Sequence, residues 1–219
     1  MMFDVQFDEA LARVLPLDIP HRERLIEKTA QHLMLIASVN KHMNLTRITD
    51  PQQAAIKHVY DSVVAWRHFQ GAKKVLDAGT GAGFPGIPLS LVLPHVRFTL
   101  AESVQKKARF VDSVVESLEL PNVHVVAQRA EERAASRHPD IITARAMAPI
   151  PRIIDLFGKA LKEGARLILY KGPDVEAELE DAEKKRLAAD VLCRYELPDG
   201  LGQRTLIQIQ RHRLARTAS

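Results

Sequence analysis

The spacing of apolar residues changes near residue 70 of the 219-residue chain. Before that point, apolar side chains recur every three or four positions, as on one face of an amphipathic helix. Leu25, Leu33 and Ile36 illustrate this spacing. After it, short apolar runs of strand length alternate with further helical stretches. The pattern predicts a basic helical extension over residues 1–70, followed by one compact α/β unit over residues 71–219.

Three helices are expected in the first segment. A short helix covers residues 7–15 and ends at Pro16, and a long amphipathic helix covers residues 20–43. A third helix covers residues 50–69, because Asp50 is an acidic cap that is followed by a proline at the first helical position. The sequence predicts no strand before residue 73.

The second segment predicts seven strands, with helices between most of them. The strands are expected at residues 73–78, 97–102, 122–127, 139–144, 166–171, 190–197 and 204–210. The helices are expected at residues 85–93, 103–118, 131–137, 150–161 and 174–189. Strands that alternate with helices in this way form a mostly parallel, doubly wound sheet with helices on both faces.

The last two predicted strands are joined differently from the others. Residues 198–203 separate them, and a parallel crossover needs about a dozen residues or more. The last strand must therefore run antiparallel to its predecessor. The sequence predicts a seven-stranded, mostly parallel sheet whose last strand is antiparallel.

The most distinctive stretch runs from Val75 to Gly86. A short apolar strand pattern ends in Asp77, glycines follow at positions 79, 81, 83 and 86, and an apolar helical pattern begins at Ile87. Glycine has no Cβ and tolerates positive φ, so a ligand can come close to the main chain. A strand, a glycine-rich turn and a helix in this order are typical of nucleotide-like ligand sites in α/β folds.

Two kinds of ligand fit this stretch. Gly81-x-Gly83-x-x-Gly86 satisfies the dinucleotide pattern, which would favour a nicotinamide-dependent oxidoreductase. Counted from the strand, however, the motif is Asp-x-Gly-x-Gly-x-Gly, which resembles the first motif of S-adenosylmethionine (SAM) dependent methyltransferases of the Rossmann-like class I fold. Glu102 ends the next strand and suits ribose hydroxyls in either case. The antiparallel last strand favours the methyltransferase layout, since a nicotinamide domain normally has six parallel strands.

Composition excludes several other classes of protein. Hydrophobic residues make up 46% of the chain, which is enough for a sizeable core, yet no apolar run approaches the roughly 20 residues of a membrane helix. The first nine residues lack the basic region and apolar core of a secretory signal. Cys193 is the single cysteine, so neither a disulfide framework nor a cysteine zinc site is expected, and no metal is. These features predict a cytoplasmic protein with no membrane contact.

Positive charge is concentrated before the glycine-rich stretch. The net charge is +4, and residues 20–74 hold nine Lys and Arg residues against four Asp and Glu residues. A second basic cluster closes the chain with Arg211, His212, Arg213 and Arg216. An uneven basic distribution of this kind favours a nucleic-acid partner, with solvated helix faces as the alternative.

Several further blocks of residues follow one another over residues 20 to 210. The glycine run continues with two prolines as Phe84-Pro85-Gly86-Ile87-Pro88, which is more specific than a generic methyltransferase motif. The other blocks are Asn40-Lys41 with Asn44-Leu45-Thr46, Lys57-His58 with Asp61-Ser62, Lys106-Lys107 with Phe110, Arg129-Ala130-Glu131, Arg145-Ala146 with Ala148, and Lys171-Gly172. Together, and in this order, the blocks resemble the RsmG family, also called glucose-inhibited division protein B. Two positions depart from the family pattern, since Glu102 stands where Asp is common and Gln128 where Gly is common.

The resemblance implies a methyltransferase that moves the methyl group of SAM to N7 of guanine 527 in 16S rRNA of the small (30S) ribosomal subunit. No general base is expected, because guanine N7 carries no hydrogen, and the protein is expected to be a monomer. Another SAM-dependent methyltransferase remains the main alternative. The implied cofactor-binding residues are Gly79, Gly81, Phe84, Glu102, Ala130, Glu131 and Arg145. The residues expected to contact the RNA, near the basic helices and the site mouth, are Arg47, Lys57, His58 and Lys171.

Overall fold

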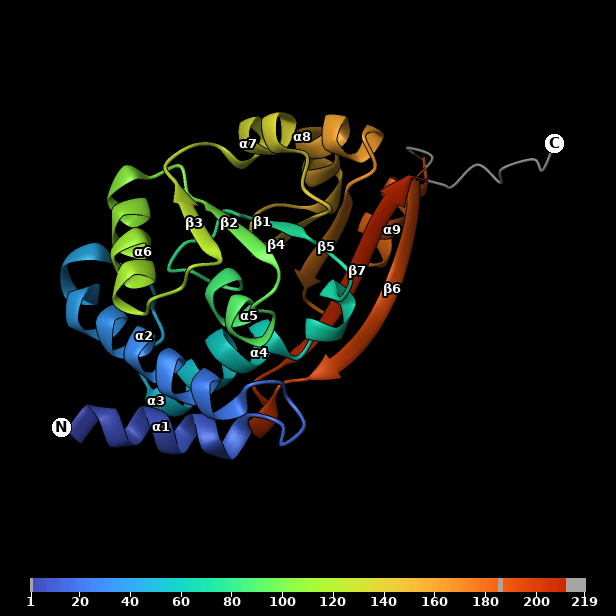
Figure 1. Ribbon diagram of the computed structural model, residues 1–219. Coiled ribbons are helices and arrows are strands. Elements are labelled where there is room, and N and C mark those ends of the chain that lie inside the picture. Colours follow the sequence, from blue (N-terminus) through green and yellow to red (C-terminus); the bar gives the residue numbers. More distant parts are fainter. Residues whose placement is uncertain (1, 185–186, 212–219) are drawn as a thin grey trace.

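The computed structural model describes residues 2–184 and 187–211 as helices around one seven-stranded sheet (Figure 1). The strands are β1 Lys74–Ala78, β2 Arg97–Ala101, β3 Val123–Val126, β4 Ile141–Arg145, β5 Arg166–Lys171, β6 Leu187–Glu196 and β7 Gln203–Arg211. The longer helices that follow β1 are α5 Gly86–Val92, α6 Gln105–Ser117, α7 Ala130–Arg137, α8 Ile150–Lys162 and α9 Glu176–Lys184. His212, Arg213 and Arg216 of the C-terminal basic cluster lie outside the described residues.

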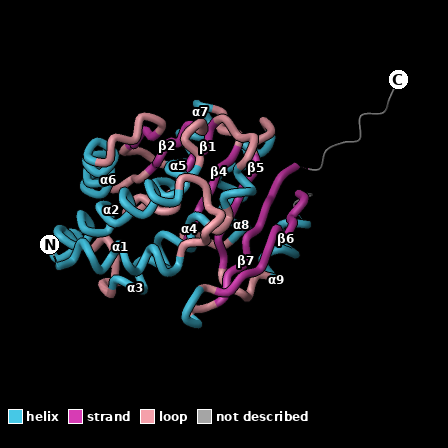
Figure 2. Tube along the Cα trace, turned by 60° about the horizontal axis from the view of Figure 1, so that its bottom comes forward, coloured by secondary structure: helices cyan, strands magenta, loops and turns pink. Residues whose placement is uncertain are grey.

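The strand order of the sheet is β3-β2-β1-β4-β5-β7-β6. Strands β1 to β5 pair in parallel, and β7 pairs antiparallel with both β5 and β6. The expected mostly parallel sheet with an antiparallel last strand is therefore confirmed. In Figure 2, β6 and β7 lie side by side as a long hairpin at one end of the sheet. The chain order reverses between β1 and β4, which is where open α/β sheets form ligand crevices.

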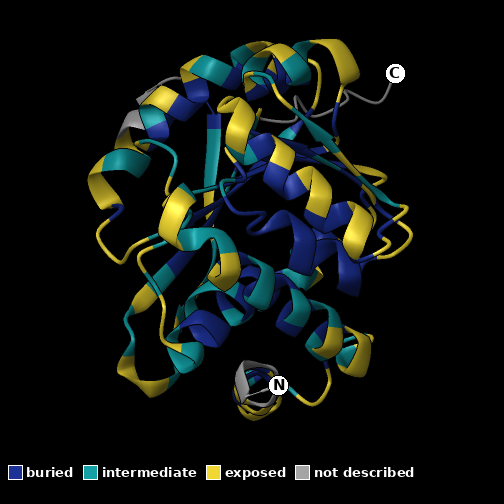
Figure 3. Ribbon diagram, turned by 90° about the vertical axis from the view of Figure 1, so that its left-hand side faces the viewer, coloured by how far each residue is buried: buried dark blue, intermediate teal, exposed yellow. Residues whose placement is uncertain are grey.

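Helices cover both faces of the sheet (Figure 1). Val75 of β1 belongs to a buried cluster with α5 and α6, whereas its neighbour Leu76 belongs to a second cluster with α7 and α8. This alternation follows from the two-residue period of a strand. Figure 3 shows the outer helices with buried positions toward the sheet and exposed positions toward solvent. The core thus consists of two apolar layers, one on each face.

The N-terminal helices complete the first of these layers. They are α1 Met2–Val14, α2 Arg22–Met43, α3 Pro51–Ala54, the π-helix η1 Ala55–Tyr60, α4 Asp61–Val63 and the 3₁₀-helix η2 Trp66–Phe69. Leu11, Leu25 and Leu33 are buried in the same cluster as Val75 and Phe98 of the sheet. The helical segment therefore shares a hydrophobic core with the α/β part of the chain.

The third N-terminal helix differs from the regular helix expected over residues 50–69. Asp50 caps it as expected, since its carboxylate accepts from the backbone N–H of Gln53 at 2.8 Å. After Ala54, however, the chain widens into a π-helix, and the Asp61 N–H bonds back to the Ile56 carbonyl. Each such turn holds one residue more than an α turn, so the following side chains rotate by about 100° around the axis.

The boundary between the last helix and β6 also differs from expectation. The expected helix over residues 174–189 ends at Lys184, and β6 begins at Leu187 rather than at residue 190. Ala188 and Ala189 favour a helix by intrinsic propensity. Their pairing with Gln210 and Ile209 of β7 overrides that preference.

Across residues 2–184 and 187–211, no helix combines the length and the apolar character needed to cross a membrane.

Candidate cofactor and substrate site

Asp77 fixes the glycine-rich loop at the carboxyl end of β1. Its fully buried carboxylate accepts from the Thr80 hydroxyl at 2.6 Å and from the Gly86 N–H at 2.9 Å. Burial raises the pKa of Asp77 to about 6. A Cβ on Gly86 would lie 2.1 Å from Leu100 Cδ2 and 2.7 Å from the Asp77 carboxylate. Gly86 is therefore required for the close packing of α5 against the strands.

Gly79 and Gly81 have a different role. Both have positive φ, +70° and +61°, and a Cβ on either would meet no protein atom closer than 3.9 Å. Their α-carbons face open space rather than packed neighbours, and both line a cavity of about 510 Å³. Main chain that is exposed to a cavity in this way lets a ligand approach the backbone.

Glu102 holds the same loop from the end of β2. One carboxylate oxygen accepts from the Gly81 N–H at 3.1 Å, and the other accepts from the Val104 N–H at 2.8 Å. The residue is buried, with 7% of its surface exposed. A carboxylate has about four acceptor positions, so these two bonds leave capacity for ligand hydroxyls.

Phe84 is the centre of an aromatic stack beneath the loop. The centre of its ring lies 4.7 Å from the centre of the His32 ring and 4.7 Å from that of the His58 ring. His32 is buried, and its Nε2 lies 2.8 Å from the Ala82 carbonyl, to which it donates as the neutral tautomer. His58 Nε2 lies 3.0 Å from the Thr46 hydroxyl. The stack ties the loop to α2 and to the π-helix η1.

Both histidines of this stack are neutral near pH 7. Burial lowers the pKa of His32 to about 4. Burial, with the charge of Arg145 as a smaller cause, lowers the pKa of His58 to about 3. His58 therefore acts as a flat aromatic wall and a hydrogen-bonding group rather than as a cation for phosphate.

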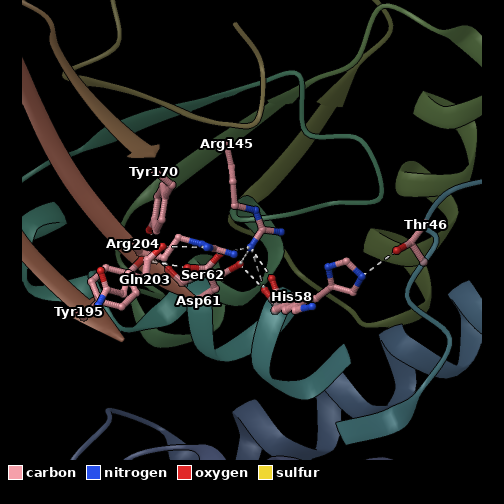
Figure 4. A network of polar contacts seen from close by, with 10 residues as sticks. Thr46, His58, Asp61, Ser62, Arg145, Tyr170, Tyr195, Gln203 and Arg204 are labelled. Carbon is pink, nitrogen blue, oxygen red and sulfur yellow. Dashed lines mark hydrogen bonds and ion pairs between the residues drawn. The ribbon is translucent and has the colours of Figure 1, made fainter. Parts of the chain in front are cut away.

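Arg145 ends β4 and reaches across to the π-helix (Figure 4). Its guanidinium donates to the Lys57 carbonyl at 2.9 Å and lies 3.3 Å from the Asp61 carboxylate. The guanidinium carbon is also 5.6 Å from the centre of the Phe84 ring. A side chain that bonds helix carbonyls is a known cause of an irregular helix. The π-helix and Arg145 thus form one structural unit.

Asp61 is the acceptor that joins the strands to this helix. Its carboxylate accepts from the Tyr195 hydroxyl at 2.9 Å and from Arg204 Nε at 3.4 Å, besides its contact with Arg145. Figure 4 shows these groups converging from three separate parts of the chain. The residue is 1% exposed. Burial and the Asp61 charge raise the pKa of Tyr195, which keeps its hydroxyl a donor.

Lys171 and Tyr170 form the far wall of the cavity. The Tyr170 hydroxyl donates to the Ser62 carbonyl at 2.8 Å. Lys171 Nζ lies 2.8 Å from the Glu178 carboxylate and 3.2 Å from the Ala148 carbonyl. Lys171 is therefore already paired within the protein, which weakens its case as a phosphate contact.

The structure brings most of the expected residues together. Seven of them line the cavity: Gly79, Gly81, Phe84, Arg145, Lys57, His58 and Lys171. Glu102 stands just behind the loop that it holds. The remaining three do not line the cavity. Ala130 and Glu131 begin α7, after β3, where Glu131 lies 3.7 Å from Arg129, and Arg47 is exposed between the lining residues Leu45 and Ile48.

Two important residues were not singled out from the sequence. His32 was hidden within the apolar stripe of α2, and Arg204 within a strand near the end of the chain. Asp61 was named only as part of a family block, and its role was hidden by the π-helix, because a regular helix would place it about 140° from the buried Ile56. Within the described residues, no three His, Cys, Asp or Glu side chains form a group able to hold a metal ion.

Solved structures share this architecture at low sequence identity. An O-methyltransferase of Bacillus cereus in complex with SAH matches with a TM-score of 0.56, at 20% identity, over 82% of this chain and 91% of that one. A precorrin-6y C5,15-methyltransferase of Geobacter metallireducens matches with a TM-score of 0.54, at 16% identity, over 75% and 90%. The strand order and the glycine loop therefore define a Rossmann-like fold that these methyltransferases share.

The family follows from sequence. The GidB family profile, described as rRNA small subunit methyltransferase G, matches residues 25–205. Ribosomal RNA small subunit methyltransferase G of Solibacter usitatus is 54% identical over 93% of this chain and 99% of its own length. That of Carboxydothermus hydrogenoformans is 35% identical over 83% and 81%. The chain belongs to the RsmG (GidB) family of methyltransferases, and the nicotinamide alternative is not favoured.

Proposed function

We propose that this protein transfers the methyl group of SAM to N7 of a guanine in 16S rRNA, at position 527. One observation carries the proposal most directly. The family match over residues 25–205 includes the glycine loop, and that loop forms one wall of a cavity that the basic N-terminal segment also lines, together with residues that follow β4 and β5. The cavity thus has a cofactor side and an RNA side.

The residues present fit SAM. Gly79 and Gly81 present main chain to the cavity without a protein neighbour at their Cβ positions. Glu102 stands at the end of β2 with acceptor capacity for ribose hydroxyls. When bound, SAM supplies a methyl group activated on a sulfonium. The loop would hold its methionine portion, and Glu102 would hold its ribose.

The reaction asks for alignment rather than for proton transfer. Guanine N7 has an in-plane lone pair and no hydrogen, so no side chain has to act as a base. Neutral His58, Phe84 and Met147 line the cavity and can pack against a flat base and exclude water. Holding two reactants in line is itself a large source of rate acceleration. We therefore assign positioning roles, and no general base, to the residues that line the cavity.

Replacing Glu102 by alanine is expected to weaken SAM binding by about 1–3 kcal/mol, since charge-assisted hydrogen bonds to the ribose and to the loop are lost. Isothermal titration calorimetry with SAM measures this change. Glu102→Gln keeps an acceptor oxygen, so its SAM affinity should lie between that of the wild type and that of Glu102→Ala. RNA affinity in the absence of SAM should not change. Unaltered SAM affinity in Glu102→Ala would remove Glu102 from the cofactor site.

The RNA would meet the protein at the basic N-terminal segment. Arg47 is exposed beside the cavity mouth, and Lys57 lines the cavity while its Nζ bonds only weakly to Gln53 at 3.2 Å. Phosphate contacts supply affinity, and an extruded guanine in the cavity would supply specificity. Because this substrate belongs to the small ribosomal subunit, we place the activity in the cytoplasm and propose that a monomer acts on the 30S particle.

The double change Arg47→Ala with Lys57→Ala is expected to weaken RNA binding and to flatten its dependence on salt. Each phosphate contact contributes about −0.7 to the log–log slope for single-stranded RNA, so the slope should fall by about one unit or more. Filter binding of 16S rRNA across a salt series measures it. The control Lys159→Ala with Lys162→Ala removes two charges at the far end of α8. Equal slopes in both variants would show that the N-terminal charges are merely solvated.

Methylation mapping tests the function itself. In a strain that lacks the gene, 16S rRNA should carry unmodified guanine 527, and restoring the gene should restore the N7 methyl group. Purified protein with labelled SAM should label 16S rRNA from the deletion strain and not rRNA from the restored strain. Methylation at another nucleotide would keep the reaction and change the target, and no transfer to any rRNA would overturn the proposal.

A further inference from the structure

A second recess lies at the opposite edge of the sheet from the cofactor and substrate cavity. It has a volume of about 410 Å³ and is lined by the amino-terminal halves of β1 and β2 and by the last turns of α7. Its walls carry four cationic side chains: Lys74, Arg97, Arg133 and Arg137. The cofactor and substrate cavity is at the carboxyl ends of the same strands, so the two sites are separated by roughly 15 Å, the length of a five-residue strand. We call this recess the α7 groove.

The four cations come together because of the fold rather than the local sequence. Lys74 and Arg97 are register partners at the starts of β1 and β2. Arg133 and Arg137 are four residues apart on α7, so they lie on the same side of that helix. α7 lies above the sheet in Figure 1, and it contacts β1 with Ala130 and Ala134 buried. Two strands and one helix thus bring like charges together.

Within the described part of the chain, residues 2–184 and 187–211, no carboxylate forms an ion pair with these four cations. The nearby carboxylate of Asp140 is engaged elsewhere, since it accepts from the backbone N–H groups of Lys73 and Lys74. Like charges that face one recess repel one another, which costs stability unless an anion is present.

Arg133 carries the clearest sign of a missing partner. Its Nε is buried and has no hydrogen-bond acceptor in the described part of the chain. A buried donor without an acceptor is costly, and such groups are rare in folded proteins. Burial and the neighbouring charge of Arg137 also lower the pKa of Arg133. Thr99, from β2, adds a hydroxyl group to the same lining.

We propose that the α7 groove is a second anion site that binds a phosphate group. Guanidinium groups match phosphate oxygens through paired hydrogen bonds, and Arg133 Nε gains its acceptor when phosphate binds. The phosphate can come from the backbone of the RNA substrate or from a free phosphorylated metabolite. An RNA strand that reaches this edge would anchor the protein at a distance from the target nucleotide. This site is independent of the methyl-transfer chemistry.

The double variant Arg133→Gln with Arg137→Gln tests the site without touching the cofactor cavity. Isothermal titration of the full chain with inorganic phosphate, at constant ionic strength, should show binding that the variant weakens about tenfold or more. Arg133→Lys with Arg137→Lys keeps both charges and should retain part of the binding. Lys159→Gln with Lys162→Gln removes two charges from neighbouring α8 and should leave phosphate binding unchanged.

Filter binding of 16S rRNA across a salt series identifies the source of the phosphate. A slope reduced by about 0.7 per lost contact in the Gln variant, but not in the α8 variant, assigns the groove to RNA. An unchanged slope together with lost phosphate binding assigns it to a free anion. Equal phosphate binding and equal slopes in the Gln and wild-type proteins overturn the proposal. SAM affinity, measured in parallel, should stay constant, so this result is separate from the fate of the proposed methyl transfer.

Discussion

Replacing Asp61 by alanine is expected to lower the free energy of unfolding by about 3–5 kcal/mol, the cost of removing one partner from a buried ion pair. The carboxylate is almost fully buried and accepts from Arg145, Tyr195 and Arg204. Without it, two guanidinium groups lose their anion and a buried hydroxyl loses its acceptor. Urea unfolding followed by circular dichroism measures the change. Asp61→Asn keeps an acceptor oxygen, so its free energy of unfolding should fall less than that of Asp61→Ala.

An exposed ion pair provides the matched control. Asp18 lies 2.8 Å from Arg67, and both side chains are more than half exposed, at 73% and 60%. Exposed pairs of this kind contribute about 0–1 kcal/mol, so Asp18→Ala should have little effect. If Asp61→Ala and Asp18→Ala destabilise the protein equally, the Asp61 network does not hold the N-terminal helices to the strands.

Replacing Gly81 by valine is expected to abolish binding of SAM and of S-adenosylhomocysteine while the fold persists. A side chain at this position would enter the cavity where the ligand must approach the backbone. The positive φ of +61° adds strain of about 1–2 kcal/mol for a residue with a Cβ. Calorimetry with S-adenosylhomocysteine measures binding, and the ligand-induced rise in melting temperature, seen in the wild type, should vanish.

Gly71→Val separates strain from obstruction. Gly71 also has a positive φ, +79°, with no atom within 4 Å of its Cβ position, and it does not line the cavity. The two variants should therefore lose similar amounts of stability, and Gly81→Val alone should lose the ligand. Retained binding in Gly81→Val would place the cofactor away from this loop.

The sequence was sufficient for the fold because its signals were local. The glycine loop, the strand and helix periods and the six-residue connection before β7 each depend on neighbouring residues, and together they led to the correct class of sheet. The short connection showed only that β7 is antiparallel to β6. Its pairing with β5 on the other side depends on contacts between distant segments, which periodicity does not encode.

The site was harder to predict from the sequence, because contacts between distant segments form part of it. Gly79, Gly81, Phe84 and Arg145 were placed by motif and by strand position, and they do line one cavity. The network around Asp61 was missed, since the helical period fails at the π-helix and its partners Arg204 and Tyr195 lie more than 130 residues away, at separations of 143 and 134. Whether Ala130 and Glu131 contact the cofactor stays a prediction.

The position of β7 also determines when the fold can be completed. β7 follows β6 in the chain but lies between β5 and β6, so β6 has no strand to pair with until β7 is in place. During synthesis, β1 to β5 can assemble before either strand of the hairpin exists. Arg204 then brings β7 to Asp61, across 143 residues of sequence. Contacts of such long range form slowly, so the part of the cavity that Arg204 lines is among the last parts of the nascent chain to become ordered.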